Sequence, residues 1–112
     1  MPNLKNDGHD TNLTFAMSWF KDWFEPKLLK PAFIKNTLFF ITFDESESKN
    51  NSNQIFSSLL GSPVHPNEAH NDDTNDTHYS VLKTIEDNWS LPSLERNDTA
   101  ATAFTKFLSQ SQ

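Results

Sequence analysis

Apolar side chains recur with helical spacing in the first third of the chain. Five of them fall at positions i, i+3, i+4, i+7 and i+8: Ala16, Trp19, Phe20, Trp23 and Phe24. That spacing places them on one face of an α-helix. The pattern therefore predicts an amphipathic helix over residues 12–30.

Residues that favour helix ends flank this segment. Asp10, Thr11 or Asn12 can supply the N-cap, because a short polar side chain there accepts a backbone N–H. Pro26 has no N–H to donate, so we expect the helix to bend or restart there. Pro31 is expected to end the segment.

Two further segments have the length and composition of strands. TLFFITF, residues 37–43, is β-branched and aromatic, and its apolar side chains are continuous rather than alternating. Continuous apolar character is typical of a strand covered on both faces, as in a parallel sheet. A ten-residue polar loop follows, and a second strand is expected over residues 54–60.

The last third returns to helical spacing after a long polar segment. Residues 62–77 contain two prolines and are too polar to pack. A helix is then expected over 79–89, with valine, leucine, isoleucine and tryptophan on one face. A final helix is expected over 98–108, capped by Asn97 or Asp98.

Composition favours a partial domain. The chain has 112 residues, of which 35% are hydrophobic and two are glycines. The length suits one domain at most, and both proportions are low for a complete α/β domain. We therefore expect residues 1–112 to form a single partial α/β domain whose central sheet is incomplete.

Charge and residue usage exclude several classes of partner. The net charge is −6, and lysine and arginine are scattered without a basic stripe. A nucleic-acid surface or an anionic membrane surface would need such a stripe, so neither partner is expected. Cysteine is absent, which excludes disulfides and thiolate chemistry.

Two sequence features that bear on localisation disagree with each other. The segment MPNLKNDGHD has no apolar core of a signal peptide, so the chain as it stands would be cytoplasmic. Five N-x-S/T sequons, at Asn12, Asn50, Asn75, Asn88 and Asn97, nevertheless hint at secretory ancestry. Together these features favour a missing N-terminal part.

Acidic and imidazole side chains cluster at the ends of expected elements. Asp44 and Glu45 directly follow the first strand, where open α/β sheets bind ligands and where paired carboxylates suit a hard cation. The alternative is a solvated turn. Asp7, His9 and Asp10 could ligate a metal, or His9 could shuttle a proton with Asp10 orienting it. The alternative there is a surface loop with Asp10 as a helix cap.

His78 stands at the beginning of the second expected helix. A charged histidine suits the helix dipole poorly there, so a neutral imidazole facing a metal or phosphate is one reading, and an ordinary surface histidine is the other. The sequence contains no G-x-S-x-G, P-loop or G-x-G-x-x-G motif. It therefore offers histidines and carboxylates but no nucleophile.

Three stretches together resemble a known family: PNLKNDGHDT (2–11), TLFFITFDE (37–45) and THYSVLKTIEDNWSLPSLERND (77–98). They resemble the fungal acid phosphatases of the phosphoesterase family, which also includes bacterial phospholipases C. The resemblance implies the C-terminal part of an alkaline-phosphatase-like α/β/α sandwich. It also implies hydrolysis of phosphate esters at low pH, and secretion or cell-wall localisation for the full-length parent.

The same resemblance implies a divalent metal ion and its ligands. Asp44 and Glu45 match the family's acidic pair at a strand end, which is expected to hold the metal. Asp7 is a further candidate ligand. The metal's identity is unknown, and no organic cofactor is expected.

Catalytic roles are likewise implied by the match. His9 and Asp10 correspond to the family's HD pair, expected near the phosphate, and His78 corresponds to the histidine of its HYS motif. The sequence departs from the family where Ser90 and Glu95 replace usual glycines. A lost glycine strains a turn that needs positive φ.

Three functions follow as hypotheses. The first is a C-terminal fragment of a metal-assisted acid phosphatase, inactive alone because the nucleophile segment is missing. The second is a non-enzymatic remnant that binds metal or phosphate, or pairs with a separate N-terminal segment. The third is a phospholipase C-type phosphodiesterase, although the sequence lacks the apolar surface loop expected for a lipid substrate.

Overall fold

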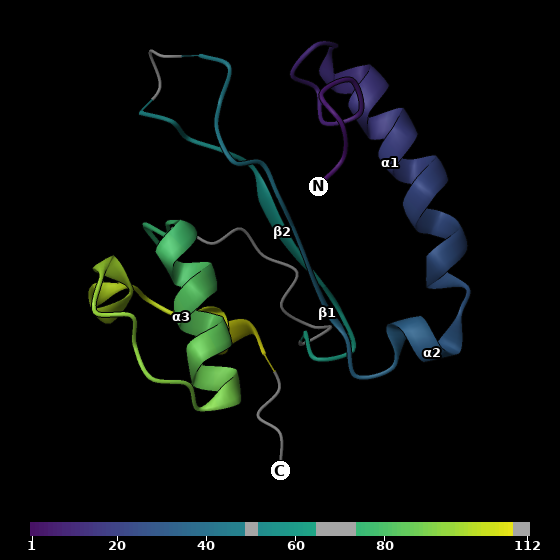
Figure 1. Cartoon of the computed structure of the whole chain (residues 1–112). Coiled ribbons are helices and arrows are strands. Elements are labelled where there is room, and N and C mark those ends of the chain that lie inside the picture. Colours follow the sequence, from purple (N-terminus) through teal and green to yellow (C-terminus); the bar gives the residue numbers. More distant parts are fainter. Residues whose placement is uncertain (49–51, 65–73, 109–112) are drawn as a thin grey trace. The chain divides into compact units, whose positions relative to one another are not determined.

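The computed structural model describes residues 1–48, 52–64 and 74–108 (Figure 1). The chain divides into two compact units, Met1–Thr37 and Leu38–Gln112. The first contains the helices α1 and α2, and the second contains the strands β1 and β2, the helix α3 and two 3₁₀ turns. The class is mixed α/β. No helix among these residues combines the length and apolar character needed to cross a membrane.

Helix α1 spans Leu13–Leu28 and begins at Asn12, whose side chain accepts the Phe15 N–H at 3.0 Å. Asn12 is therefore the cap, rather than Asp10 or Thr11. The helix does not restart at Pro26, because it continues through this residue to Leu28. A proline this close to the helix end removes only one backbone hydrogen bond.

Pro31 begins a helix instead of ending one. Helix α2 spans Pro31–Ile34 and has Pro31 in its first turn. The first N–H groups of a helix have no intrahelical partner, so the missing N–H of proline costs nothing there. The expected end at Pro31 is therefore wrong, since α1 has already stopped at Leu28.

The apolar face of α1 is only partly buried within its unit. Ala16 and Phe24 are buried, whereas the Trp23 side chain remains 46% exposed. Aromatic rings stack along the helix, with the centroids of Phe20 and Phe24 lying 5.0 Å apart. Lys27 places its Nζ 3.8 Å from the Trp23 ring, a cation–π contact that covers part of this face.

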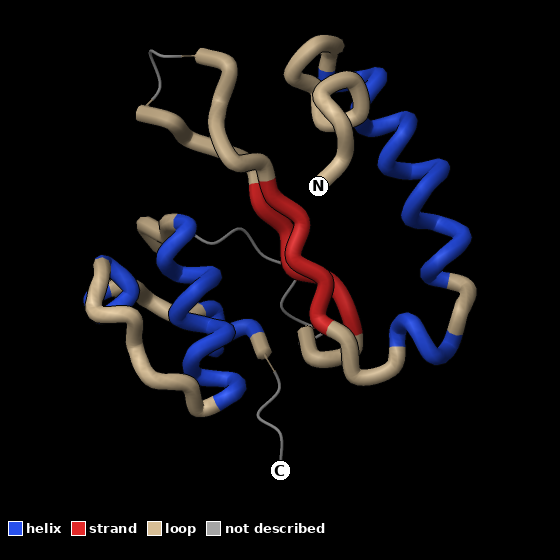
Figure 2. The backbone as a smooth tube through the Cα atoms, viewed as in Figure 1, coloured by secondary structure: helices blue, strands red, loops and turns tan. Residues whose placement is uncertain are grey.

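Strands β1 (Leu38–Thr42) and β2 (Ser57–Gly61) form a two-stranded antiparallel sheet (Figure 2). Leu38 pairs with Gly61 and Thr42 with Ser57. The inference of a parallel sheet from the apolar run is wrong for this pair. β1 is half-buried rather than covered on both faces, and an antiparallel pair needs no crossover helix.

Helix α3 spans His78–Trp89 and begins with a capping box between Thr77 and Ser80. Its buried residues are polar: Ser80, Thr84 and Glu86. Ile85 and Trp89, expected on the buried face, are exposed. The spacing indicated the helix correctly but indicated the wrong face, because burial depends on which segments pack against it.

The expected helix over 98–108 is replaced by two short 3₁₀ turns, Asn97–Ala100 and Phe104–Phe107. The Asp98 carboxylate does not cap a helix. It accepts the backbone N–H groups of Leu94 and Arg96, which fold the preceding connector back on it. Ala101 is extended, and so the two turns remain separate.

Candidate functional site

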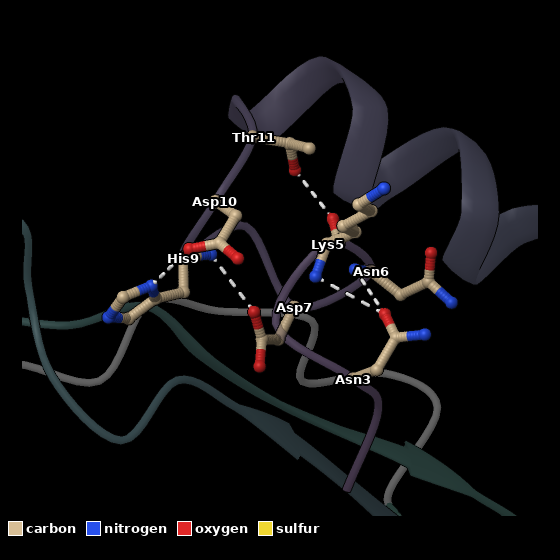
Figure 3. Close-up of polar contacts among 7 residues, drawn as sticks. All are labelled: Asn3, Lys5, Asn6, Asp7, His9, Asp10 and Thr11. Atoms are coloured by element: carbon tan, nitrogen blue, oxygen red, sulfur yellow. Dashed lines mark hydrogen bonds and ion pairs between the residues drawn. The ribbon is translucent and has the colours of Figure 1, made fainter.

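Asn3 organises the loop that precedes α1 (Figure 3). Its side-chain Oδ1 accepts the N–H groups of Lys5 at 3.2 Å and Asn6 at 3.0 Å. The Thr11 hydroxyl then donates to the Lys5 carbonyl, and the Asp10 N–H donates to the Leu4 carbonyl. The loop is thus folded on itself by its own polar groups. Asn3 was not among the predicted site residues, although asparagine is typical of such turns.

Asp7, His9 and Asp10 lie together within this loop (Figure 3). The Asp7 Oδ1 accepts the His9 N–H at 2.9 Å, and the His9 Nδ1 lies 2.8 Å from the Asp10 Oδ1. If Nδ1 donates to Asp10, the neutral imidazole carries its lone pair on Nε2. Both side chains of the pair are more than half exposed. The contact holds the imidazole of His9 beside the Asp10 carboxylate.

Gly8 makes the turn between Asp7 and His9 possible. Its φ is +99°, which side chains with a Cβ rarely adopt, and a Cβ built there would lie 3.6 Å from the Ala16 Cβ. The space is therefore adequate and the backbone conformation is the constraint. Glycine at this position allows the chain to turn directly before His9 and Asp10.

Asp44 and Glu45 follow β1 after one intervening residue, and both are exposed. The Asp44 Oδ1 accepts the Glu45 N–H at 3.1 Å. The Asn53 Oδ1 accepts the Ser46 N–H at 2.8 Å, and this bond holds the residue that directly follows Glu45. The role of Asn53 is visible only in the fold.

His78 lies beside the acidic pair within the second unit. Its Nε2 is 2.8 Å from the Asp44 backbone carbonyl oxygen, 34 residues away in sequence. A carbonyl only accepts, so Nε2 carries the proton and donates. The capping box of Thr77 and Ser80 fixes the first turn of α3 and with it the position of His78. The T-x-x-S spacing of Thr77 and Ser80 is a sequence signal for such a cap, and it was not used to predict the beginning of α3.

The structure thus assembles two groups of predicted site residues. One is Asp7, His9 and Asp10 in the first unit, and the other is the acidic pair with His78 in the second. In the second group the contact is through the Asp44 backbone, not through its carboxylate. His65 and His70 lie outside the described residues.

The donor set suits a hard divalent cation but is incomplete. Carboxylate oxygens are the ligands that such ions prefer. Within residues 1–48, 52–64 and 74–108, however, no group of three or more histidine, aspartate or glutamate side chains converges to hold one. The residues present therefore do not by themselves fit a complete metal site.

Comparison with known proteins gives a consistent set of relatives. The chain is 47% identical over 102 residues to an acid phosphatase of Aspergillus fumigatus, covering 89% of this chain and 23% of the relative. It is 46% identical over 99 residues to a probable acid phosphatase of Kluyveromyces lactis, covering 87% and 23%. It is 41% identical over 101 residues to a phosphate-repressible acid phosphatase of Penicillium chrysogenum, covering 89% and 24%. No solved structure matches the chain.

The similarity covers most of the chain but little of each relative. The chain spans about a quarter of the length of the curated relatives that it matches. The Phosphoesterase family matches residues 1–92, which include all six predicted site residues. The resemblance inferred from the sequence is confirmed, and the chain belongs to the phosphoesterase family.

Proposed function

We propose that this chain supplies part of the active site of an acid phosphatase that hydrolyses phosphate esters. The observation that carries the proposal is the His9–Asp10 pair, 2.8 Å apart, inside the segment that matches the family. The names of the relatives support the substrate class. A complete alkaline-phosphatase-like α/β/α sandwich would need strands beyond the two present here.

His9 is the proposed general acid. At acid pH an imidazole is largely protonated, because its ordinary pKa is about 6.5, and it can donate a proton to the leaving alcohol. Asp10 would hold the ring in place and stabilise its charged form. The hydrogen bond between the two supports these roles.

His78 is proposed as a second histidine facing the phosphate. Its Nε2–H is committed to the Asp44 carbonyl, which fixes the ring and leaves Nδ1 as the other polar atom. In this role a protonated Nδ1–H donates to a phosphoryl oxygen, or an unprotonated Nδ1 accepts from a bridging water, and His78 takes no part in covalent chemistry. Its position also couples α3 to the strand end that carries the acidic pair.

Asp44 and Glu45 are proposed to supply oxygen ligands to a divalent metal ion, and Asp7 is a further proposed metal ligand. When bound, such an ion polarises phosphoryl oxygens and neutralises developing negative charge. Because these residues do not complete a site, the remaining ligands would come from the part of the family fold that this chain does not span. The nucleophile is proposed to lie there too, so we expect the 112 residues alone to turn over little substrate.

The direct test is a chimera with a relative. Residues 1–92 would replace the matching segment of the Aspergillus fumigatus acid phosphatase, and hydrolysis of p-nitrophenyl phosphate would be measured near pH 5. We expect activity to survive. His9→Asn or His78→Asn should lower kcat by about 10²-fold or more, in the range of lost general acid–base catalysis, whereas Glu25→Gln on the exposed face of α1 should not. A folded but inactive chimera would contradict the proposal.

The isolated chain provides the complementary assay. We expect little or no turnover with or without divalent metal. Clear turnover that Asp44→Ala abolishes would show that the site is complete without the rest of the fold. Binding of a metal without turnover, measured by isothermal titration, would favour the second candidate function, a remnant that binds metal or phosphate. Hydrolysis of phosphatidylcholine in preference to p-nitrophenyl phosphate would favour a phospholipase C-type phosphodiesterase.

We further propose that the full-length protein is secreted or held at the cell wall. The five sequons support this localisation. Expression of the full-length gene should give a secreted product whose mobility increases after endoglycosidase treatment. A product retained inside the cell, with unchanged mobility, would contradict it.

A further inference from the structure

Asp98 is a fully buried carboxylate, with an exposed fraction of 0%. Its Oδ2 accepts the Ser93 hydroxyl at 2.5 Å and the Leu94 N–H at 2.9 Å, and its Oδ1 accepts the Arg96 N–H at 2.7 Å. These donors favour the ionised form. The Ser93 hydroxyl, followed by the two backbone N–H groups, lowers the pKa of Asp98 to about 2 in spite of its burial.

Glu86, on α3, is a second buried carboxyl group, and its backbone carbonyl accepts the N–H of Leu91 in the connector at 2.9 Å. Its exposed fraction is 3%, and neither Oε1 nor Oε2 has a hydrogen-bond partner among the described residues. Burial, and then the negative charge of Asp98, raise the pKa of Glu86 above its ordinary value of 4.5. A buried ionised carboxylate without a partner is costly, so the neutral acid is the form that fits this position.

We propose that Glu86 and Asp98 form a pH-sensitive carboxyl pair that holds the connector, residues 90–96, against α3 in acid and loosens it at neutral pH. In acid, Glu86 keeps its proton and turns its hydroxyl toward the Asp98 carboxylate. When the proton leaves for solvent, two buried negative charges face each other across the α3–connector contact. The connector, which Asp98 folds through Leu94 and Arg96, is the segment released.

The other charged groups near the pair are few. Lys83, one turn before Glu86 on α3, lowers the pKa of Glu86, but its Nζ already lies 2.7 Å from the Asp87 carboxylate. From the connector, Glu95 and Arg96 are exposed. Lys83 thus interacts electrostatically with both carboxyl groups, but its hydrogen bond goes to Asp87, and no described cation forms an ion pair with Glu86 or Asp98. The proton is the ligand proposed for the pair.

The sign of the pH dependence follows from the two shifts. The raised pKa of Glu86 gives stability that is present below 4.5 and is lost as the pH rises through the raised value. The lowered pKa of Asp98 gives stability that is present above 3.8 and is lost as the pH falls toward 2. The pair therefore stabilises the fold most between pH 3.8 and 4.5.

The first test compares three forms of the whole 112-residue chain. Urea unfolding is measured from pH 4 to pH 7 for the wild type, Glu86→Gln and Glu25→Gln. Glutamine keeps the shape and cannot ionise, so Glu86→Gln should lose less stability than the wild type as the pH rises. Glu25→Gln, the same change at an exposed position, should follow the wild-type curve. Parallel curves for the wild type and Glu86→Gln would overturn the proposal.

The second test reads the proton directly and does not depend on a variant that folds. Carbon-13 NMR of the side-chain carboxyl should show Glu86 titrating with a midpoint above 4.5, and a midpoint at or below it would overturn the proposal. The titration is repeated with Ca²⁺. A saturable Ca²⁺-dependent shift of the Glu86 signal at pH 7 would make the pair a cation site and would also overturn it. None of the residues proposed for catalysis or metal binding is involved, so a negative chimera result leaves this test unaffected.

Discussion

Ser90 and Glu95 have backbone conformations that ordinarily call for glycine. Their φ angles are +52° and +57°, in the left-handed region, where a Cβ lies too close to the following carbonyl oxygen. The resemblance to the family implied glycine at both positions, and the positive φ angles give a physical reason for it. Ser90 ends α3, the position where glycine is most common after a helix.

Replacing these residues with glycine should therefore stabilise the chain. Ser90→Gly and Glu95→Gly are each expected to raise the free energy of unfolding by about 0.5–1 kcal/mol, because removing the left-handed strain outweighs the added chain entropy. Urea unfolding measures the change. Ser18→Gly, in the interior of α1, is the matched control and should lower stability by a similar amount. Equal losses for Ser18→Gly and Ser90→Gly would show that Ser90 is not strained.

Helix ends show how local chemistry sets an element. Asn12 caps α1, and Thr77 with Ser80 caps α3, each by side-chain bonds to otherwise unpaired N–H groups. Both helices begin within a residue of where periodicity predicted them. Their ends were harder to predict, because Pro26 is tolerated near the end of α1 and Pro31 is favoured at the beginning of α2.

Loss of the α1 cap should have a measurable cost. Asn12→Ala leaves the Phe15 N–H without its side-chain acceptor and is expected to lower the free energy of unfolding by about 1 kcal/mol. Asn12→Asp keeps an acceptor and should retain most of the stability. Thermal unfolding by circular dichroism distinguishes the two. Equal destabilisation by both changes would mean that the cap contributes nothing.

Thr84 links α3 to the segment that follows it. Its hydroxyl donates to the Ser80 carbonyl at 2.7 Å and accepts the Phe104 N–H at 2.9 Å. Thr84→Val keeps the shape but leaves that N–H unpaired, which should cost about 1–3 kcal/mol. Thr84→Ser retains the hydroxyl and is the control. Amide exchange at Phe104 should accelerate in the valine variant alone, and unchanged protection would contradict the assignment.

At the scale of the whole molecule, the chain exposes apolar surface that a complete domain would cover. Ile85, Trp89 and Leu94 in the second unit are exposed, and both strands of the sheet have an unpaired edge among the described residues. Unpaired strand edges invite pairing with another chain. The chain spans about a quarter of its relatives. The unused surface is consistent with a larger family fold around it.

Mixing experiments test whether the exposed apolar surface and the strand edges pair with a separate N-terminal segment. A separate N-terminal segment, taken from the Kluyveromyces lactis relative and ending where the match to this chain begins, should restore hydrolysis of p-nitrophenyl phosphate when combined with the 112 residues. The apolar and strand-edge surfaces provide the association energy. The matched control uses His9→Asn, which should associate but remain inactive. Absence of association in sedimentation experiments would argue against pairing.

The sequence by itself determined the family, the helices α1 and α3 and the two strands. Helical spacing, cap residues and the NDGHD and HYS stretches are local signals, and each fixes structure or chemistry over a few residues. Local order also placed His9 beside Asp10 in space, since adjacent residues in a tight loop cannot separate.

Only the tertiary structure decided the relative direction of the strands, the buried face of α3 and the contacts between residues far apart in the sequence. It made β1 and β2 antiparallel, turned Thr84 and Glu86 inward, split the last helix into two 3₁₀ turns, and brought His78 to the Asp44 carbonyl. These outcomes depend on which segments pack together, a free-energy balance over the whole chain that no short window of sequence contains.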